Sequence, residues 1–165
     1  MSRGIVLYAT RYGSTQEIAE TLANKLDFDS KNVMYIDDGS ILDEYDQIIL
    51  GSPIYYDDIV EDMKRFISSF FIKLGGKKLF TFAVYGATKG KMDIDYAAKF
   101  ADYFSPQPAI AVAFLGRATK SSLNKKDYKY LQIFYKNRLK ADLSDFDYFD
   151  ENKIDIVVEK IKQAM

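Results

Sequence analysis

Hydroxyl-bearing residues gather between positions 10 and 15, after a short apolar run and before helically spaced Ile18, Leu22 and Leu26. The start of a helix presents unpaired backbone N–H groups and the positive end of the helix dipole, so it attracts anions. Gly13 has no side chain, which lets the backbone approach a bound group closely. These residue types in this order predict a phosphate-binding turn, Thr10-Arg11-Tyr12-Gly13-Ser14-Thr15.

The composition of this turn indicates the kind of phosphate that it would bind. It contains no lysine, so it differs from the Gly-x-x-x-x-Gly-Lys loop that holds nucleoside triphosphates. It also lacks the three spaced glycines of a dinucleotide site. We therefore predict a site for one terminal phosphate. An ordinary strand–turn–helix connection with a Ser or Thr cap is the alternative.

Two further segments, residues 51–58 and residues 85–90, bring tyrosines to predicted strand ends. Tyr55 and Tyr56 follow a Ser-Pro turn, and Tyr85 precedes a run of small residues. Aromatic rings stack in offset geometries that contribute about 0.5–1.5 kcal/mol beyond the area they bury. The two segments therefore predict a site for a large flat ring. The alternatives are that these tyrosines are surface, core or simple strand-end residues.

The composition restricts the chemistry that the side chains can perform. The 165 residues include no cysteine and no histidine, which excludes thiol nucleophiles, disulfides, thiolate–zinc sites and histidine acid–base schemes. Redox chemistry would therefore need a bound cofactor. The net charge is −1, so no global field favours nucleic acid. We predict no metal site and no catalytic side chain.

Alternating strands and helices must position these residues. Apolar runs predict a strand that ends at Ala9, before the turn, and further strands over residues 32–36, 46–51, 78–84 and 109–115. Apolar residues at three- and four-residue spacing predict helices over 14–26, 58–72, 93–104 and 150–164, with a single helical turn near 40–44. The strands are mostly unbroken by polar residues, as expected for strands that are covered on both faces.

This alternation predicts one α/β domain over residues 1–165, in which a doubly wound parallel five-stranded sheet lies between two helical layers. Right-handed crossovers leave few topologies, and strand order 2-1-3-4-5 is one of them. Ligands of such sheets bind beyond the carboxyl ends of the strands, here the first, third and fourth. The last connection, residues 116–149, is long enough to contain a helical insertion.

The motifs in order resemble those of the flavodoxin superfamily, whose members bind FMN. Val6 through Thr15, with Ala19, resembles the phosphate loop, and Ile49 through Tyr55 resembles the second flavin loop. The resemblance implies a flavodoxin-like fold and FMN as the cofactor. It implies that the following residues bind FMN: Thr10, Arg11, Tyr12, Gly13, Ser14, Thr15, Ser52, Pro53, Ile54, Tyr55, Tyr56, Tyr85, Gly86, Ala87 and Thr88.

The tail of the chain resembles one branch of this superfamily, the menaquinone-dependent protoporphyrinogen oxidases. Leu115-Gly116, a basic insertion and the stretch 142–147 carry this resemblance. It implies an FMN-dependent oxidoreductase that passes electrons from a porphyrinogen to a quinone. Two alternatives are a flavodoxin that carries single electrons between soluble redox partners and a flavin-free scaffold on the same fold. The near-neutral charge and the absence of glycine from residues 52–60 favour the first interpretation over a carrier.

The insertion is basic, since residues 116–145 contain eight lysines and arginines against three aspartates. Drawn as one helix, Lys125, Lys129, Lys136 and Lys140 occupy one sector. Tyr128, Leu131, Phe134, Tyr135 and Leu139 occupy the opposite side. The lysine sector would suit peripheral contact with an anionic membrane, and the apolar side would suit docking on the domain itself. Both interpretations remain open.

Location is also predicted from the sequence. The chain shows no signal-peptide pattern at its start, and no apolar run approaches the ~18 residues of a transmembrane helix. We therefore expect a cytoplasmic protein, with contact at the inner face of the membrane as an addition if the basic insertion binds lipid. Its expected partner is a redox protein or a quinone.

Overall fold

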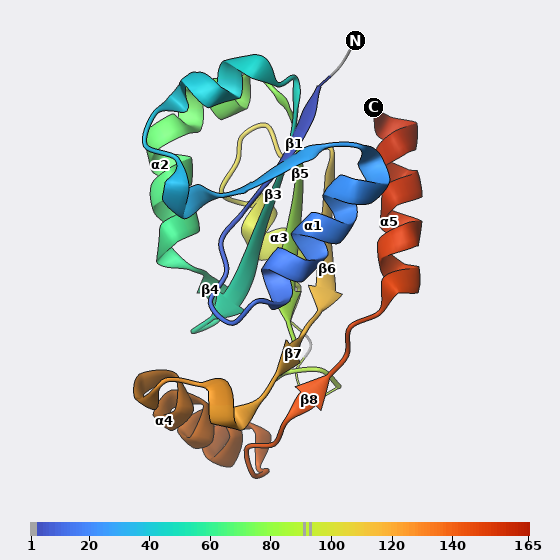
Figure 1. Cartoon of the computed structure of the whole chain (residues 1–165). Helices are drawn as coiled ribbons and strands as arrows, with labels where there is room; N and C mark the ends of the chain where they lie inside the picture. The colour runs from blue at the N-terminus through green and yellow to red at the C-terminus, as the bar shows by residue number, and fades with distance from the viewer. Residues whose placement is uncertain (1–2, 91, 93) are drawn as a thin grey trace.

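A parallel sheet of five strands forms the centre of the computed structural model, which describes residues 3–90, 92 and 94–165 (Figure 1). The strand order is β2-β1-β3-β5-β6, which confirms the predicted topology. A sixth short strand, β4 (Asp58–Ile59), pairs antiparallel with the end of β3. The parallel strands are β1 (Gly4–Tyr8), β2 (Asp29–Asn32), β3 (Gln47–Tyr55), β5 (Lys78–Tyr85) and β6 (Ile110–Leu115).

Two helical layers cover the sheet, as predicted. Helices α1 (Ser14–Leu26) and α5 (Glu151–Ala164) lie on one face, and α2 (Glu61–Gly75) and α3 (Tyr96–Ala101) lie on the other (Figure 1). Alternate residues of β1 enter different cores, because successive side chains of a strand point to opposite faces. Val6 packs in the core under α1 and α5, and Leu7 packs in the core under α2.

Two strands, β2 and β3, differ from their predicted bounds by more than one residue. The second strand was predicted over 32–36, but β2 ends at Asn32 and a 3₁₀ turn (Val33–Tyr35) follows. β2 is an edge strand with exposed polar residues, so its sequence lacks the apolar pattern of a central strand. β3 was predicted to end at Gly51, yet it continues through Pro53 to Tyr55. Pro53 lies beyond the last β1–β3 pair, where one side of the strand needs no N–H donor.

The helices agree with their predicted positions, with shifted ends. Helix α2 begins at Glu61 rather than at residue 58, and α3 is shorter than the predicted 93–104. Residue 93 itself lies outside the described residues. The single turn near 40–44 is a 3₁₀ helix (Gly39–Glu44). Among the described residues, no helix combines the length and hydrophobicity needed to cross a membrane.

The long connection between β6 and α5 forms a helical insertion beyond the carboxyl ends of the strands (Figure 1). It leaves the domain through β7 (Arg117–Ala118) and returns through β8 (Phe146–Asp147), which pairs antiparallel with β7. Between these strands lie a 3₁₀ turn (Lys120–Ser122), helix α4 (Lys125–Phe134) and a π-helical turn (Tyr135–Leu139).

One expectation for the insertion was wrong, because it is not a single regular helix. Helix α4 ends at Phe134, a π-helical turn follows, and Lys140 caps this turn in a left-handed conformation, so the sector drawn for one continuous α-helix does not describe Lys140. Tyr128, expected on the packed side, is exposed, whereas Phe134 and Tyr135 are buried as expected.

Candidate cofactor-binding site

The turn between β1 and α1 has the backbone geometry that the sequence suggested. Gly13 adopts φ 100°, a left-handed conformation that other residues rarely adopt, and it precedes the first residue of α1. Its N–H donates to Oγ1 of Thr10 at 3.1 Å, which closes the turn. The carbonyl of Gly13 accepts the first helical hydrogen bond, from the N–H of Glu17. The turn therefore directs the start of α1 toward the carboxyl edge of the sheet.

Thr15 provides the clearest indication of a ligand. Its side chain is 1 % exposed, and its hydroxyl oxygen Oγ1 has no hydrogen-bond partner in the described part of the chain. Thr15 lines the pocket that opens at the start of α1. A buried hydroxyl without a partner is unfavourable, so a phosphate oxygen at this position would satisfy it. The residues of this turn therefore fit the phosphate of FMN.

Ser14 also lines the pocket, but its hydroxyl is hydrogen-bonded to the insertion. Oγ donates to the carbonyl oxygen of Arg117 and accepts from the N–H of Arg117, both at 3.0 Å. The hydroxyl thus ties the turn to β7 of the insertion. This connection needs a close approach of two backbones, because a Cβ at Gly116 would meet Ser14 and Val84.

The pocket brings together thirteen of the fifteen residues predicted to bind FMN: Thr10, Arg11, Tyr12, Ser14, Thr15, Pro53, Ile54, Tyr55, Tyr56, Tyr85, Gly86, Ala87 and Thr88. Gly13 does not line it and acts through the shape of the turn. Ser52 does not line it either, and its side chain is fully buried. Its hydroxyl donates to the carbonyl oxygen of Pro53 and accepts from the N–H of Val60, which fixes the β3–β4 connection.

Tyrosines from the β3 and β5 ends form the walls of the pocket. The guanidinium of Arg11 lies 4.8 Å from the ring centroid of Tyr55, and burial raises the pKa of the Tyr55 phenol above its ordinary value. The ring of Tyr85 lies 5.0 Å from that of Tyr96 in α3. Burial raises the pKa of Tyr96 to about 12. The phenols of Tyr55 and Tyr96 therefore remain neutral at physiological pH.

The segment after β5 has little room for larger side chains. A Cβ at Gly86 would collide with the ring of Phe146 in β8, so only glycine fits beneath this ring. Phe146 stacks on Tyr148 with centroids 5.1 Å apart, and Phe146 also lines the pocket. The insertion is therefore in contact with the site at its return strand as well as through α4.

Helix α4 contributes a wall that the sequence did not reveal. Tyr130, Leu131 and Phe134 line the pocket, and the ring of Tyr130 lies 4.1 Å from that of Tyr56. The predicted docking side of the insertion contained Leu131 and Phe134, but its spacing could not show that this side meets the strand ends. The lining residues that sequence reasoning missed are Asp57, Val84, Tyr96, Gly116, Arg117, Ala118, Leu123, Tyr130, Leu131, Phe134 and Phe146.

Asp127 of α4 is a buried charged residue on the same helix as this wall. Its side chain is 1 % exposed and accepts hydrogen bonds from Arg11, Tyr12 and Tyr56. Burial lowers the pKa of Arg11, but the charge of Asp127 and its hydrogen bond outweigh this effect and raise it. Arg11 therefore stays charged. Its guanidinium pairs with Asp127 of α4.

The comparisons with known proteins agree with this architecture. Residues 5–147 match the family model described as a flavodoxin domain. A solved flavodoxin from the domain Archaea has 18% identity and a TM-score of 0.54, with 78% of this chain and 90% of that chain covered. Oxidised Flavodoxin 1 from Bacillus cereus has 23% identity and a TM-score of 0.53, with 87% and 100% covered.

A flavoprotein from Lactobacillus acidophilus, solved in complex with FMN, has 15% identity and a TM-score of 0.53, with 70% of this chain and 93% of that chain covered. At these identities the solved structures establish a shared fold. The family match adds the sequence relationship, because it spans most of the chain and includes the phosphate turn and both tyrosine segments. This protein therefore belongs to the flavodoxin domain family.

Proposed function

We propose that this protein binds FMN in the pocket at the carboxyl edge of its sheet and exchanges electrons with a redox partner. The observation that carries the proposal is the buried Thr15 hydroxyl, which has no hydrogen-bond partner among the residues that the structure describes and lies where α1 begins. Bound FMN supplies the redox chemistry that a chain without cysteine or histidine cannot provide with its side chains.

Each part of the pocket has a role in this proposal. The hydroxyls of Thr10 and Thr15 and the backbone N–H groups at the N-terminus of α1, which begins at Ser14, bind the phosphate, since hydroxyls and helix N–H groups are donors to anions. The tyrosines hold the flat ring, and the small residues after β5 let the ring lie against the backbone. The contacts assigned to the ring are Pro53, Ile54, Tyr55, Tyr56, Tyr85, Gly86, Ala87 and Thr88.

Titration of purified protein with FMN tests the proposal, with quenching of flavin fluorescence as the signal. Riboflavin is the matched control, because it has the same ring without the phosphate. We expect FMN to bind and riboflavin to bind at least about tenfold more weakly, which corresponds to about 1.4 kcal/mol. A preparation that neither contains nor takes up FMN would overturn the proposal.

The second question is what exchanges electrons with the flavin. One candidate is a carrier that serves a redox partner protein, which is consistent with the family. The other is an oxidoreductase of the protoporphyrinogen oxidase type that passes electrons to a quinone. The apolar wall formed by Tyr130, Leu131 and Phe134 favours the second candidate, because the apolar face of a porphyrinogen or of a quinone ring could contact it.

Two assays with the FMN-loaded protein distinguish these candidates. In the first, protoporphyrinogen is offered with a water-soluble naphthoquinone, and porphyrin fluorescence is followed. In the second, the reduced protein is mixed with a small haem protein as a one-electron acceptor. Porphyrin formation above the no-protein rate supports the oxidase. Its absence together with rapid reduction of the haem supports the carrier.

A further inference from the structure

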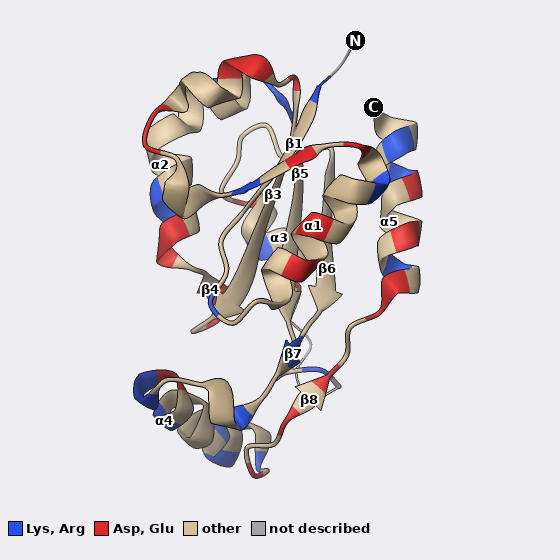
Figure 2. Cartoon of the chain, viewed as in Figure 1, with Lys and Arg blue, Asp and Glu red and all other residues tan. Residues whose placement is uncertain are grey.

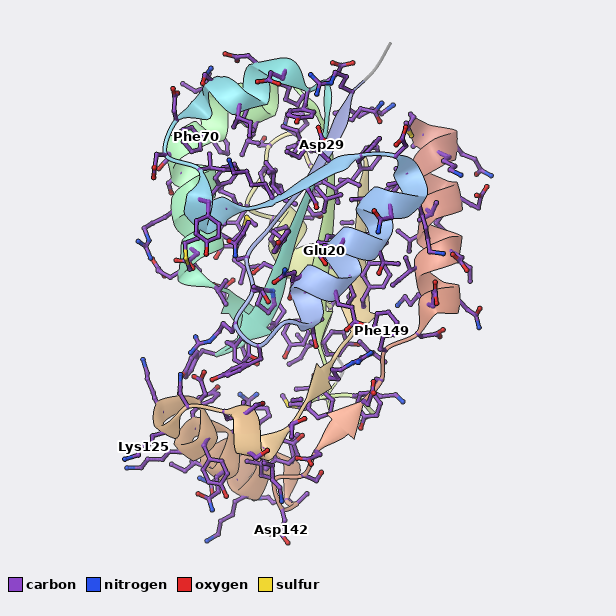
Figure 3. The ribbon with its side chains drawn as sticks, viewed as in Figure 1. Glu20, Asp29, Phe70, Lys125, Asp142 and Phe149 are labelled. Carbon is purple, nitrogen blue, oxygen red and sulfur yellow. The ribbon has the colours of Figure 1, made fainter. Side chains whose placement is uncertain are left out.

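Asp127 differs from its neighbours on α4. The lysines around it are exposed, and Figure 2 shows basic residues on the outer surface of this helix. In Figure 3 the side chain of Lys125 projects away from the domain. The side chain of Asp127 is 1 % exposed. Burial of a carboxylate is costly unless it is paired, so its contacts identify what it holds.

The contacts of Asp127 come from two other walls of the pocket. Arg11 and the hydroxyl of Tyr12 both donate to Oδ2, and the hydroxyl of Tyr56 donates to Oδ1 at 3.1 Å. Arg11 and Tyr12 belong to the phosphate turn, and Tyr56 belongs to the segment after β3. One carboxylate therefore connects α4 to both predicted FMN-binding segments.

The N-terminus of α4 strengthens this network. Oδ1 of Asn124 accepts from the N–H of Asp127 at 2.7 Å and caps the helix. The N–H of Asn124 donates to the hydroxyl of Tyr12 at 3.1 Å. The Tyr12 hydroxyl therefore accepts from Asn124 and donates to Asp127, which fixes its direction. The first turn of α4 cannot move away without breaking these bonds together.

We propose that Asp127 is a positioning residue of the cofactor site. Its hydrogen bonds hold α4 against the pocket, so FMN enters or leaves only when this network opens. The inference rests on the proposed FMN binding. With α4 in this position, Tyr130, Leu131 and Phe134 line one side of the pocket and shield that side from water. Asp127 also holds Arg11 and Tyr12 in one arrangement, so the turn is ordered before FMN arrives.

Dissociation of FMN is the direct test, with the variants Asp127→Asn and Arg138→Gln compared. Arg138 is the matched control because it also ties the insertion to the domain, through an ion pair with Asp57 at 3.0 Å, but it does not line the pocket. FMN released from the loaded protein is captured by an excess of an unrelated apoflavoprotein. We expect Asp127→Asn to raise the dissociation rate by at least about tenfold, and Arg138→Gln by less than about twofold.

Hydrogen exchange across residues 125–139 separates positioning from simple stabilisation. In the unaltered protein, FMN should slow exchange in this segment, because the flavin and α4 stabilise each other. In Asp127→Asn, FMN should still bind but give little of this protection. If Asp127→Asn does not fold, Tyr12→Phe removes the hydroxyl that donates to the same carboxylate and accepts from Asn124, and it should raise the dissociation rate by about threefold.

The outcomes separate this inference from the proposed function. If the unaltered protein binds FMN and Asp127→Asn releases it no faster than Arg138→Gln does, the inference is wrong and the proposed function stands. Equal dissociation rates for Tyr12→Phe and the unaltered protein would have the same meaning. If the unaltered protein binds no FMN, both fail.

Discussion

The hydroxyl of Thr15 gives a test at the scale of one atom. Thr15→Val keeps the shape of the side chain and removes only the donor, so FMN affinity should fall by about 1.5–3 kcal/mol. Riboflavin affinity should not change, because riboflavin has no phosphate. The free energy of unfolding without FMN should stay equal or rise, since the buried hydroxyl has no partner to lose. Fluorescence titration and urea unfolding measure these effects, and unchanged FMN affinity would place the phosphate elsewhere.

Tyr85 provides the corresponding test for the flavin ring. Tyr85→Ala removes an aromatic wall of the pocket, so FMN should bind more weakly, by about 0.5–1.5 kcal/mol beyond the lost buried area. Bound flavin should also fluoresce more strongly, because a quenching neighbour is gone. Tyr35→Ala is the control, since that side chain is 69 % exposed and does not line the pocket. Equal effects of both variants would show that Tyr85 does not contact the ring.

Residues of the site differ in how well the sequence could predict them. The phosphate turn was predictable because its hydroxyls, Gly13 and the start of α1 are close together along the chain. Asp127 was not, because its contact with Arg11 joins residues 116 positions apart. In the sequence Asp127 is one acidic residue among lysines, and nothing in its spacing indicates burial. Long-range contacts of this kind determine the side of the pocket that the sequence missed.

At the scale of elements, the strand boundaries also divide into those that a local sequence pattern indicates and those that depend on contacts distant along the chain. The central strands were located well because burial on both faces requires continuous apolar residues. The edge strand β2 has exposed residues such as Asp29 and Ser30, so its pairing with β1 leaves no apolar signal. β3 extends past its apolar run because β4 and β5 continue to pair with it.

The lysines of the insertion test whether this element also contacts a membrane. Lys125, Lys129, Lys136 and Lys140 are exposed, and each cation near an anionic surface contributes about 1 kcal/mol. If the element binds lipid, changing all four to Gln should abolish sedimentation with anionic vesicles and leave FMN affinity intact. High salt should weaken binding of the unaltered protein, as the Debye length shortens from ~10 Å at 0.1 M to ~3 Å at 1 M.

Lys160→Gln with Lys162→Gln is the control for charge alone, because these exposed lysines lie on α5, outside the insertion. Vesicle binding should survive this change. If the unaltered protein stays in the supernatant with anionic vesicles at low salt, lipid contact is excluded as a role for this surface. The remaining role of the insertion is then to dock on its own domain, with these lysines exposed to solvent.

At the scale of the whole molecule, buried and partly buried tyrosines make stability sensitive to alkaline pH. Burial raises the pKa of Tyr45, Tyr96 and Tyr103 from 10.0 to about 12. The folded state therefore favours the neutral phenols, and the stability that they contribute is complete below pH 10 and is lost as the pH rises toward 12. The free energy of unfolding should fall by up to about 1.4 kcal/mol per pH unit for each such phenol in this range.

Urea unfolding at about pH 9 and in steps toward about pH 11 measures this loss, and the near-ultraviolet absorbance of tyrosinate reports ionisation. The phenols should ionise together with unfolding rather than before it. Stability that does not change over this range would show that these side chains ionise within the folded protein.

The pairing of β7 with β8 has a consequence for how this chain can be shortened. Ala118 and Phe146 face each other as a cross-strand pair, so the points where the insertion leaves and returns are adjacent. A two-residue type I′ turn such as Asn-Gly could therefore join them after excision of residues 119–145. The truncated chain would keep the sheet, the phosphate turn and Phe146 above Gly86. We therefore expect the insertion to be removable, and a single deletion would take the α4 wall away from the cofactor site and leave that side open.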